Sequence, residues 1–281
     1  MNQTFVFSRW QMLVAGHWAE NRKRYLLALL AMGGLLAAWY GFLLTIDKFG
    51  PVNLFLQFTA YYCGLYFVGC FYASTIFSEL GSKSRAIQYL SVPASHLEKL
   101  LCGILFGVVL FFLAYTAVFY LVDIPMVSLG NQVIARQHQH WPGTFEPIGT
   151  VQVLNLWNNP WAPIPDRKFH LFLLGYFAVQ SAFLLGSVYF ARWSFIKTVI
   201  GILLFWGGFI MFTDKVVNEH LPAGWHAYDM LRWYDNPDNS SVFRMVQLPD
   251  TVERLLVILV QYSIPPAFWV ITYFRLKEKE V

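Results

Sequence analysis

The chain alternates between long apolar runs and shorter polar segments. About 20 consecutive apolar residues in a helix cross the hydrocarbon core of a bilayer, and runs of that length occur six times. They lie at Tyr25–Ile46, Val52–Phe77, Leu101–Ile124, Phe169–Trp193, Phe195–Thr213 and Leu255–Phe274. The pattern predicts an all-α integral membrane protein with six transmembrane helices in one membrane domain, residues 25–281.

The first 24 residues show a different pattern. Apolar and aromatic residues recur there at spacings of three and four, which places them on one stripe of a short helix: Trp10, Leu13, Val14, His17 and Trp18. Basic residues follow at 22–24. This favours a cytoplasmic helix that lies in the membrane interface. The alternative is an N-terminal extension of the first span. That span is too long for the core of a signal peptide, so we expect it to stay as an anchor.

Composition and charge support the membrane interpretation and orient the chain. Only 13% of residues are charged, against about a quarter in soluble domains. With both termini in the cytoplasm, twelve of the 20 Lys and Arg residues fall on the inner side, as the positive-inside rule requires. Segments 125–168 and 214–254 are then two extracytoplasmic loops. The net charge of +4 follows from this rule and does not indicate nucleic-acid binding.

The sequence contains no motif that would make this chain an enzyme. It has no G-x-x-x-x-G-K-[ST] phosphate-binding loop, no G-x-S-x-G and no H-E-x-x-H. His138 and His140 share a face if the chain is extended there, but no third metal ligand has a defined spacing. A polar outer loop is the more economical interpretation. We expect neither a catalytic residue nor a metal or other cofactor in this chain.

Polar residues inside the apolar runs are few. Gln57, Gln180 and Gln261 either line a transport path or hold the helices together, and Pro265 and Pro266 kink the last span or act as its hinge. Ionisable residues are nearly absent from the spans. That argues against a carrier driven by protons or sodium, which normally uses intramembrane carboxylates.

The polar segment Glu79–Lys99, called the elbow below, lies between the second and third apolar runs. Residues 84–91 can form about two helical turns before Pro93 interrupts them. The next helix then begins in one of two ways: Pro93 occupies its first turn, or Ser95 caps it with Glu98 in a capping box. The simplest interpretation is a re-entry turn. Twenty polar residues are long for a turn, so we favour a docking site for a soluble partner.

The pattern Tyr-Leu-x-x-Pro-Ala-Ser-x-x-Glu-Lys in the elbow resembles the inner loop of the permease subunits of ABC-2 type ABC transporters. Its residues here are Tyr89, Leu90, Pro93, Ala94, Ser95, Glu98 and Lys99. The resemblance implies that the elbow is a coupling helix docked on a separate ATPase subunit, which binds the ATP and Mg. The residues implied in docking are Lys83, Arg85, Gln88, Tyr89, Pro93, Ala94, Ser95, Glu98 and Lys99. One departure from the family is the long loop 125–168.

The resemblance also implies a second permease half, identical or different, and a place in the bacterial cytoplasmic membrane. The expected function is export of an unknown substrate, coupled to ATP hydrolysis by the partner. An alternative is a non-transporting membrane protein, in assembly or sensing, that holds a soluble protein through the elbow. A third is a membrane enzyme acting at the outer face through His138 and His140.

Overall fold

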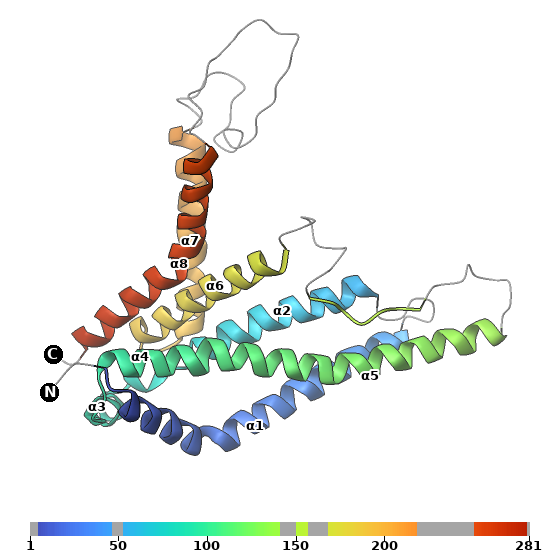
Figure 1. Cartoon of the computed structure of the whole chain (residues 1–281), viewed down its shortest axis with the longest axis horizontal. Coiled ribbons are helices and arrows are strands. Elements are labelled where there is room, and N and C mark those ends of the chain that lie inside the picture. Colours follow the sequence, from blue (N-terminus) through green and yellow to red (C-terminus); the bar gives the residue numbers. More distant parts are fainter. Residues whose placement is uncertain (1–4, 47–52, 141–149, 157–167, 218–249, 280–281) are drawn as a thin grey trace, which may run out of the picture.

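The computed structural model describes residues 5–46, 53–140, 150–156, 168–217 and 250–279. Within these ranges the chain is helical apart from short connections and residues 150–156, and it contains no β-strand. The all-α class predicted from the apolar pattern is confirmed. Helices α1, α2, α5 and α6 run side by side along the long axis of the molecule (Figure 1).

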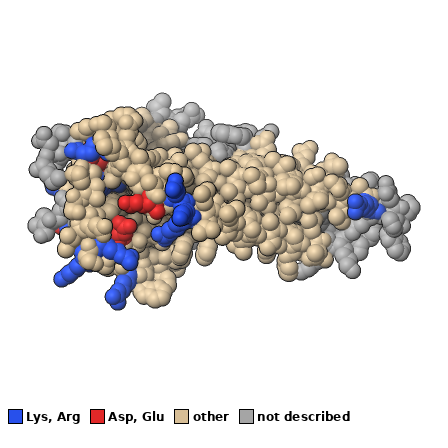
Figure 2. Space-filling view, turned by 90° about the horizontal axis from the view of Figure 1, so that it is seen from below, with Lys and Arg blue, Asp and Glu red and all other residues tan. Residues whose placement is uncertain are grey.

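Five helical stretches among the described residues are long and apolar enough to cross a bilayer. They are Phe7–Thr45, Leu54–Ala73, His96–Arg136, Phe172–Tyr189 and Ser194–Val216. Figure 2 shows a wide band without charged side chains along one face of the molecule, with charged side chains gathered mainly at one end. Such a surface suits a bilayer, so the chain is a membrane-embedded helical protein. The sixth expected span lies in α8 (Asp250–Glu278), which is not among these five.

Helix α1 (Phe7–Ile46) joins two parts that the sequence pattern separated. Its 40 residues would measure about 60 Å if straight, twice the thickness of a hydrocarbon core of about 30 Å. No proline interrupts it, and the helix bends between its two halves without breaking (Figure 1). The N-terminal residues therefore belong to the same helix as the first span. Whether they lie in the interface stays a prediction.

The third apolar run belongs to a helix much longer than expected. Helix α4 (His96–Ile104), a π-helical stretch η2 (Leu105–Leu110) and α5 (Phe111–His140) follow one another without a gap. The helix does not end near Ile124 but continues through Pro125, since a proline can keep the helical backbone and give up one hydrogen bond. Residues 125–140, expected as the start of an outer loop, are helical.

The remaining helices complete the bundle, and some of them project from it. Helix α2 (Leu54–Ala73) begins at Asn53, whose side chain accepts a hydrogen bond from the Leu56 amide at 2.8 Å. Helix α6 (Lys168–Tyr189) packs against α2, and α7 (Ser194–Phe212) follows with a π-helical end η3 (Thr213–Val217). In Figure 1 both α7 and the first part of α8 point away from the bundle, and the last part of α8 returns along α6.

Two places shape the arm, which comprises α7, η3 and the first part of α8. Trp193, just before α7, has a left-handed backbone (φ 59°) that redirects the chain. Pro265 and Pro266 lie inside α8, where they remove backbone hydrogen bonds. Figure 1 shows that α8 bends between the arm and the bundle. Only 6% of the most apolar stretch of α7 is buried, against 44% for α6. The arm thus packs little against the rest of the described chain.

The main core is aromatic and lies between α2, α5 and α6. Its buried members include Tyr61, Leu65, Tyr115, Phe119 and Tyr176. A second cluster lies at the end of the bundle that carries the elbow, and it draws on α6, α8 and the elbow itself. The start of α1 and the end of α8 also lie near this end (Figure 1).

Candidate functional site

The elbow comprises the end of the 3-10 helix η1 (Ser78–Gly81), the short helix α3 (Lys83–Ser91), a turn and the start of α4. After α2, η1 leads into α3, and α4 begins after Ser95. Ser95 caps α4, and the capping box with Glu98 is complete. Of the two starts proposed for this helix, the structure has the second. The predicted helix at 84–91 is confirmed.

The nine residues implied in docking fall into three groups by exposure. Exposed are Lys83, Arg85, Gln88 and Pro93. Half-buried are Tyr89 and Ala94, and buried are Ser95, Glu98 and Lys99. Only the first group and parts of the second can touch a partner directly. The buried group lies behind this surface and supports it.

The Glu98 carboxylate connects the elbow to the start of α1. Arg9 donates from Nε to Oε2 and from Nη2 to Oε1, both at 2.7 Å, and the Val6 amide donates to Oε1 at 2.8 Å. The Ser95 amide completes the set with a donation to Oε2 at 2.8 Å. Glu98 is fully buried while the Arg9 side chain is 31% exposed. We call this arrangement the clasp; four donated hydrogen bonds offset the burial of the charge.

Lys99 lies directly beside the clasp and is also buried, with an exposed fraction of 2%. Its Nζ lies 5.6 Å from the centre of the Tyr89 ring, within the range of a cation–π contact. Tyr89 and Ala86 lie three residues apart on α3 and face the cluster of Phe77, Leu100 and Leu184. This inward face fixes how α3 sits on the bundle, because positions three apart share one side of a helix.

Gly81 brings the elbow into close contact with the turn between α6 and α7. A Cβ at Gly81 would collide with the backbone carbonyl oxygen of Ala191. The neighbouring cluster also includes Val188 of α6 and Leu276 of α8. The elbow is therefore fastened to three helices: to α1 through the clasp, and to α6 and α8 through apolar packing.

One exposed residue of the elbow escaped the sequence reasoning. Ile87 is 69% exposed on α3, beside Arg85 and Gln88. The helical spacing could have predicted this exposure. If Ala86 and Tyr89 form the face of α3 that packs on the bundle, Ile87 points to the opposite face. The surface of α3 thus combines two cations, an amide and an aliphatic group.

The glutamines expected in a transport path hold backbone groups. Gln57 binds residues 150–156, as described below. Gln180 of α6 is fully buried and, with its amide nitrogen turned to the Gly69 carbonyl, donates to it at 2.9 Å and accepts from the Cys70 amide at 3.1 Å. This supports the helix-packing alternative for both residues. The side chain of Gln261 lies outside the described part of the chain.

Asp123 is an intramembrane carboxylate that the sequence reasoning overlooked. It lies in α5, within the third expected span, and is fully buried. The Tyr40 hydroxyl of α1 donates to its Oδ1 at 2.7 Å, and its Oδ2 has no hydrogen-bond partner among the described residues. The third expected span therefore contains a buried carboxylate of the kind that ion-coupled carriers use. The near absence of ionisable groups no longer speaks against such a carrier.

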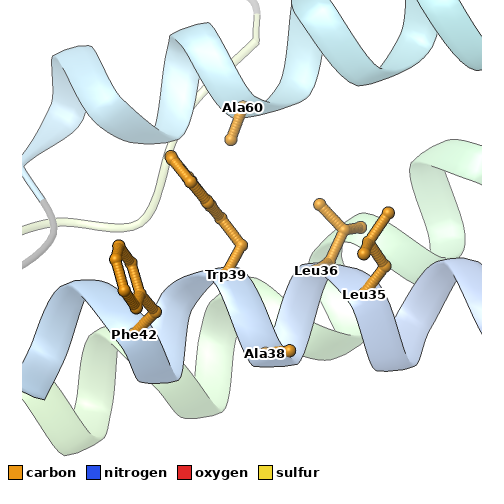
Figure 3. Close-up of a pocket in the computed structure, with 6 residues that line it drawn as sticks. All are labelled: Leu35, Leu36, Ala38, Trp39, Phe42 and Ala60. Atoms are coloured by element: carbon orange, nitrogen blue, oxygen red, sulfur yellow. The ribbon is translucent and has the colours of Figure 1, made fainter.

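A groove between α1 and α2 has a purely hydrophobic character. Five residues of α1 and Ala60 of α2 line it, and Trp39 points across toward Ala60 (Figure 3). The residues of α1 are Leu35, Leu36, Ala38, Trp39 and Phe42. Such a lining fits hydrocarbon, as in the acyl chain of a lipid, and provides no charged group that would select a ligand.

The described residues contain no group of three or more His, Cys, Asp or Glu side chains that could hold a metal ion. The side chains of His138 and His140, considered as a metal pair, lie outside this part of the chain. Comparison with known proteins found no matching family model, no matching curated protein and no matching solved structure. The resemblance to ABC-2 permeases therefore stays a prediction from the elbow motif and the order of the expected spans and loops.

Proposed function

We infer that this chain is the membrane-spanning permease subunit of an ABC-2 type transporter, and that a separate ATPase subunit docks on its elbow. The observation that supports this most is the combination of an exposed α3 surface with rigid connections behind it. Lys83, Arg85, Ile87 and Gln88 are exposed, while the clasp and the apolar cluster join the same segment to three helices.

The proposed mechanism is mechanical. ATP and Mg bind to the partner, whose movement displaces α3. Because the clasp connects the elbow to α1, and because Tyr89 and Leu80 pack into the cluster shared with α6 and α8, a displacement of α3 reaches three helices at once. Packed elements move as discrete bodies and do not deform continuously, so the helices would shift and open a path for export of a substrate yet to be identified.

The surface of α3 favours an acidic partner surface with an apolar centre. Lys83 and Arg85 offer cations to carboxylates, and Ile87 offers an aliphatic group that would be buried on docking. Charged residues mainly set the association rate and the choice of partner, while buried apolar groups carry more of the affinity. In this proposal both termini lie in the cytoplasm of a bacterium, α8 is the sixth span, and a second permease half completes the transporter.

Co-purification with the candidate ATPase tests the proposal. The full chain is tagged, co-expressed with the ATPase and purified in detergent, and both the amount of ATPase and its hydrolysis rate are measured. We expect Lys83→Glu with Arg85→Glu, or Ile87→Asp alone, to reduce co-purification at least about tenfold. Arg136→Glu, an exposed charge reversal on α5, serves as the matched control and should retain the partner.

The outcomes separate the candidate functions. Absence of any ATPase with the wild-type chain, or equal co-purification of the α3 variants and the control, contradicts docking through the elbow. An ATPase that associates but whose hydrolysis rate is the same with and without this chain favours the non-transporting membrane partner.

A further inference from the structure

Residues 150–156, called the strap, run in an extended form against α2 and α5, away from the elbow (Figure 1). An extended segment without a neighbouring strand must find partners for its backbone N–H and C=O groups, because unpaired polar groups in an apolar bundle are costly. Here helix side chains supply those partners.

Three side chains bind five backbone groups of the strap. Asn131 donates to the Val151 carbonyl at 3.0 Å and accepts from the Val151 amide at 2.9 Å. Gln57 donates to the Gln152 carbonyl at 3.1 Å and accepts from the Leu154 amide at 2.8 Å. The Tyr120 hydroxyl donates to the Leu154 carbonyl at 3.0 Å. A carboxamide offers a donor and an acceptor side by side, so each amide imitates a neighbouring strand.

The side chains of the strap divide into two kinds. Leu154 and Leu156, two residues apart, are buried in the aromatic core beside Tyr61, Phe119 and Tyr176. Gln152, Val153 and Asn155 are exposed. Positions two apart in an extended chain point to the same side. Val151 is half-buried and packs against the cluster of Tyr40, Val122 and Val127. The contacts therefore demand an extended backbone with apolar side chains at 151, 154 and 156.

These features match the way extended peptides are recognised elsewhere in proteins: main-chain hydrogen bonds give affinity, and pockets for alternate side chains give selectivity. The receiving groups belong to helices and not to the strap: Gln57 is in the first turn of α2, and Tyr120 and Asn131 are in α5. Gln57 is fully buried. The receiving surface is thus built into the bundle.

We propose that α2 and α5 form a binding groove for extended polypeptide, and that the strap occupies it as an internal ligand. The ligand class is a peptide with apolar side chains two residues apart, recognised through its backbone. This site lies apart from the elbow, so the inference holds whether or not an ATPase docks there.

In the test, substitutions displace the strap, and a separate peptide with the same sequence is then added. A fluorescent synthetic peptide with the sequence of residues 150–156, TVQVLNL, is titrated against the purified full chain in detergent. The wild-type groove is occupied and should bind little peptide. The variant Leu154→Asp with Leu156→Asp, which removes the two buried anchors, should bind it saturably. Adding Gln57→Ala to that variant should weaken binding about tenfold, because two backbone contacts are lost.

A matched pair of peptides tests backbone recognition. N-methylation of Leu154 removes the amide that donates to Gln57 and places a methyl group against that side chain, so it should weaken binding about tenfold or more. N-methylation of Val153, whose amide donates to none of the three side chains that hold the strap, should have little effect. Equal binding of the two peptides contradicts the proposal, as does the absence of binding to a displaced variant that elutes as the wild type does.

A second variant guards against misfolding. If the double Asp variant does not fold, residues 150–156 are replaced by Gly and Ser, which keeps the length and buries no charge. If neither variant folds, the strap is part of the core and not a ligand, and the proposal is overturned.

Discussion

The elbow and the strap are both fastened to the helical bundle, but by different chemistry. Charged groups fasten the elbow: Glu98 binds Arg9, and Lys99 lies over Tyr89. Neutral amides and a hydroxyl fasten the strap by binding its backbone. The end that carries the elbow also gathers most charges on the face shown in Figure 2. Charged contacts thus hold the segment at the charged end of the bundle, and neutral contacts hold the segment away from that end.

The difference has a physical reason. An unpaired amide in an apolar bundle is costly, but an unpaired charge is far more so. Removing one partner of the charged clasp therefore destabilises the fold by more than the intact pair contributes to its stability. The neutral fastening of the strap recognises an extended backbone and can be satisfied by any segment of that shape. Four substitutions test this contrast.

Glu98→Ala should have the largest effect. It removes the acceptor of four hydrogen bonds and the capping box of α4, which we expect to lower the free energy of unfolding by about 3 kcal/mol. The measurement is denaturation of the purified chain in mixed detergent micelles. Glu278→Ala is the control, because the Arg275–Glu278 pair is exposed and contributes about 1 kcal/mol or less. Equal losses for the two would remove the distinction between a buried clasp and a surface pair.

Gln57→Ala should have the next largest effect and act at the strap. Two backbone groups, the Leu154 amide and the Gln152 carbonyl, lose their partner, at a cost of about 2–3 kcal/mol. Hydrogen exchange should accelerate at the Leu154 amide and remain unchanged in α3. Gln132→Ala, an exposed glutamine of α5, provides the control. Faster exchange in the elbow would show that the two ends are coupled and not independent.

Gly81→Ala tests the apolar side of the elbow. The new methyl group would meet the backbone of Ala191, which cannot turn aside as a side chain would, so we expect a loss of about 1–3 kcal/mol in unfolding free energy. Gly34→Ala is the matched substitution, since no atom lies within 4 Å of the position that its Cβ would take. It should be neutral or stabilising within its helix. A neutral Gly81→Ala would mean that the close contact between η1 and the turn after α6 is not needed for stability.

Tyr89→Leu should have the smallest effect. It removes the aromatic ring beneath the Lys99 ammonium and should cost about 1 kcal/mol, whereas Tyr89→Phe keeps the ring and should cost less. Both variants are compared by the same micelle denaturation. If Phe is as harmful as Leu, the tyrosine hydroxyl matters more than the ring, and the cation–π contact is not what holds α3.

Local sequence signals predicted the elbow well. Ser95 and Glu98 three residues apart predicted a capping box, and Pro93 predicted the break between α3 and α4, because both signals act within a few residues. The partner of Glu98 could not be predicted in this way: Arg9 lies 89 residues earlier. Glu98, a charged residue in a polar segment, was therefore predicted to lie at the surface, although the fold buries it completely.

Helix boundaries and the roles of polar residues were harder to predict. A proline in the sequence does not say whether a helix stops or continues, and α5 continues through Pro125. Gln57 and Gln180 were rightly seen as polar groups needing partners in lipid, but their partners are backbone groups of distant segments. Asp123 was overlooked because a single carboxylate in an apolar run has no local pattern; only the fold places Tyr40 beside it.

By itself the sequence determined that this is a helical protein with several apolar helices long enough to cross a membrane, and where the elbow bends. These properties depend on apolar run length, capping and proline position, all of which act over a few neighbouring residues. The tertiary structure decided which side chains of the elbow remain exposed, what Glu98 binds, and that glutamine, asparagine and tyrosine side chains hold an extended strap. Those outcomes depend on segments far apart in the chain, since burial and pairing arise only when the helices pack together.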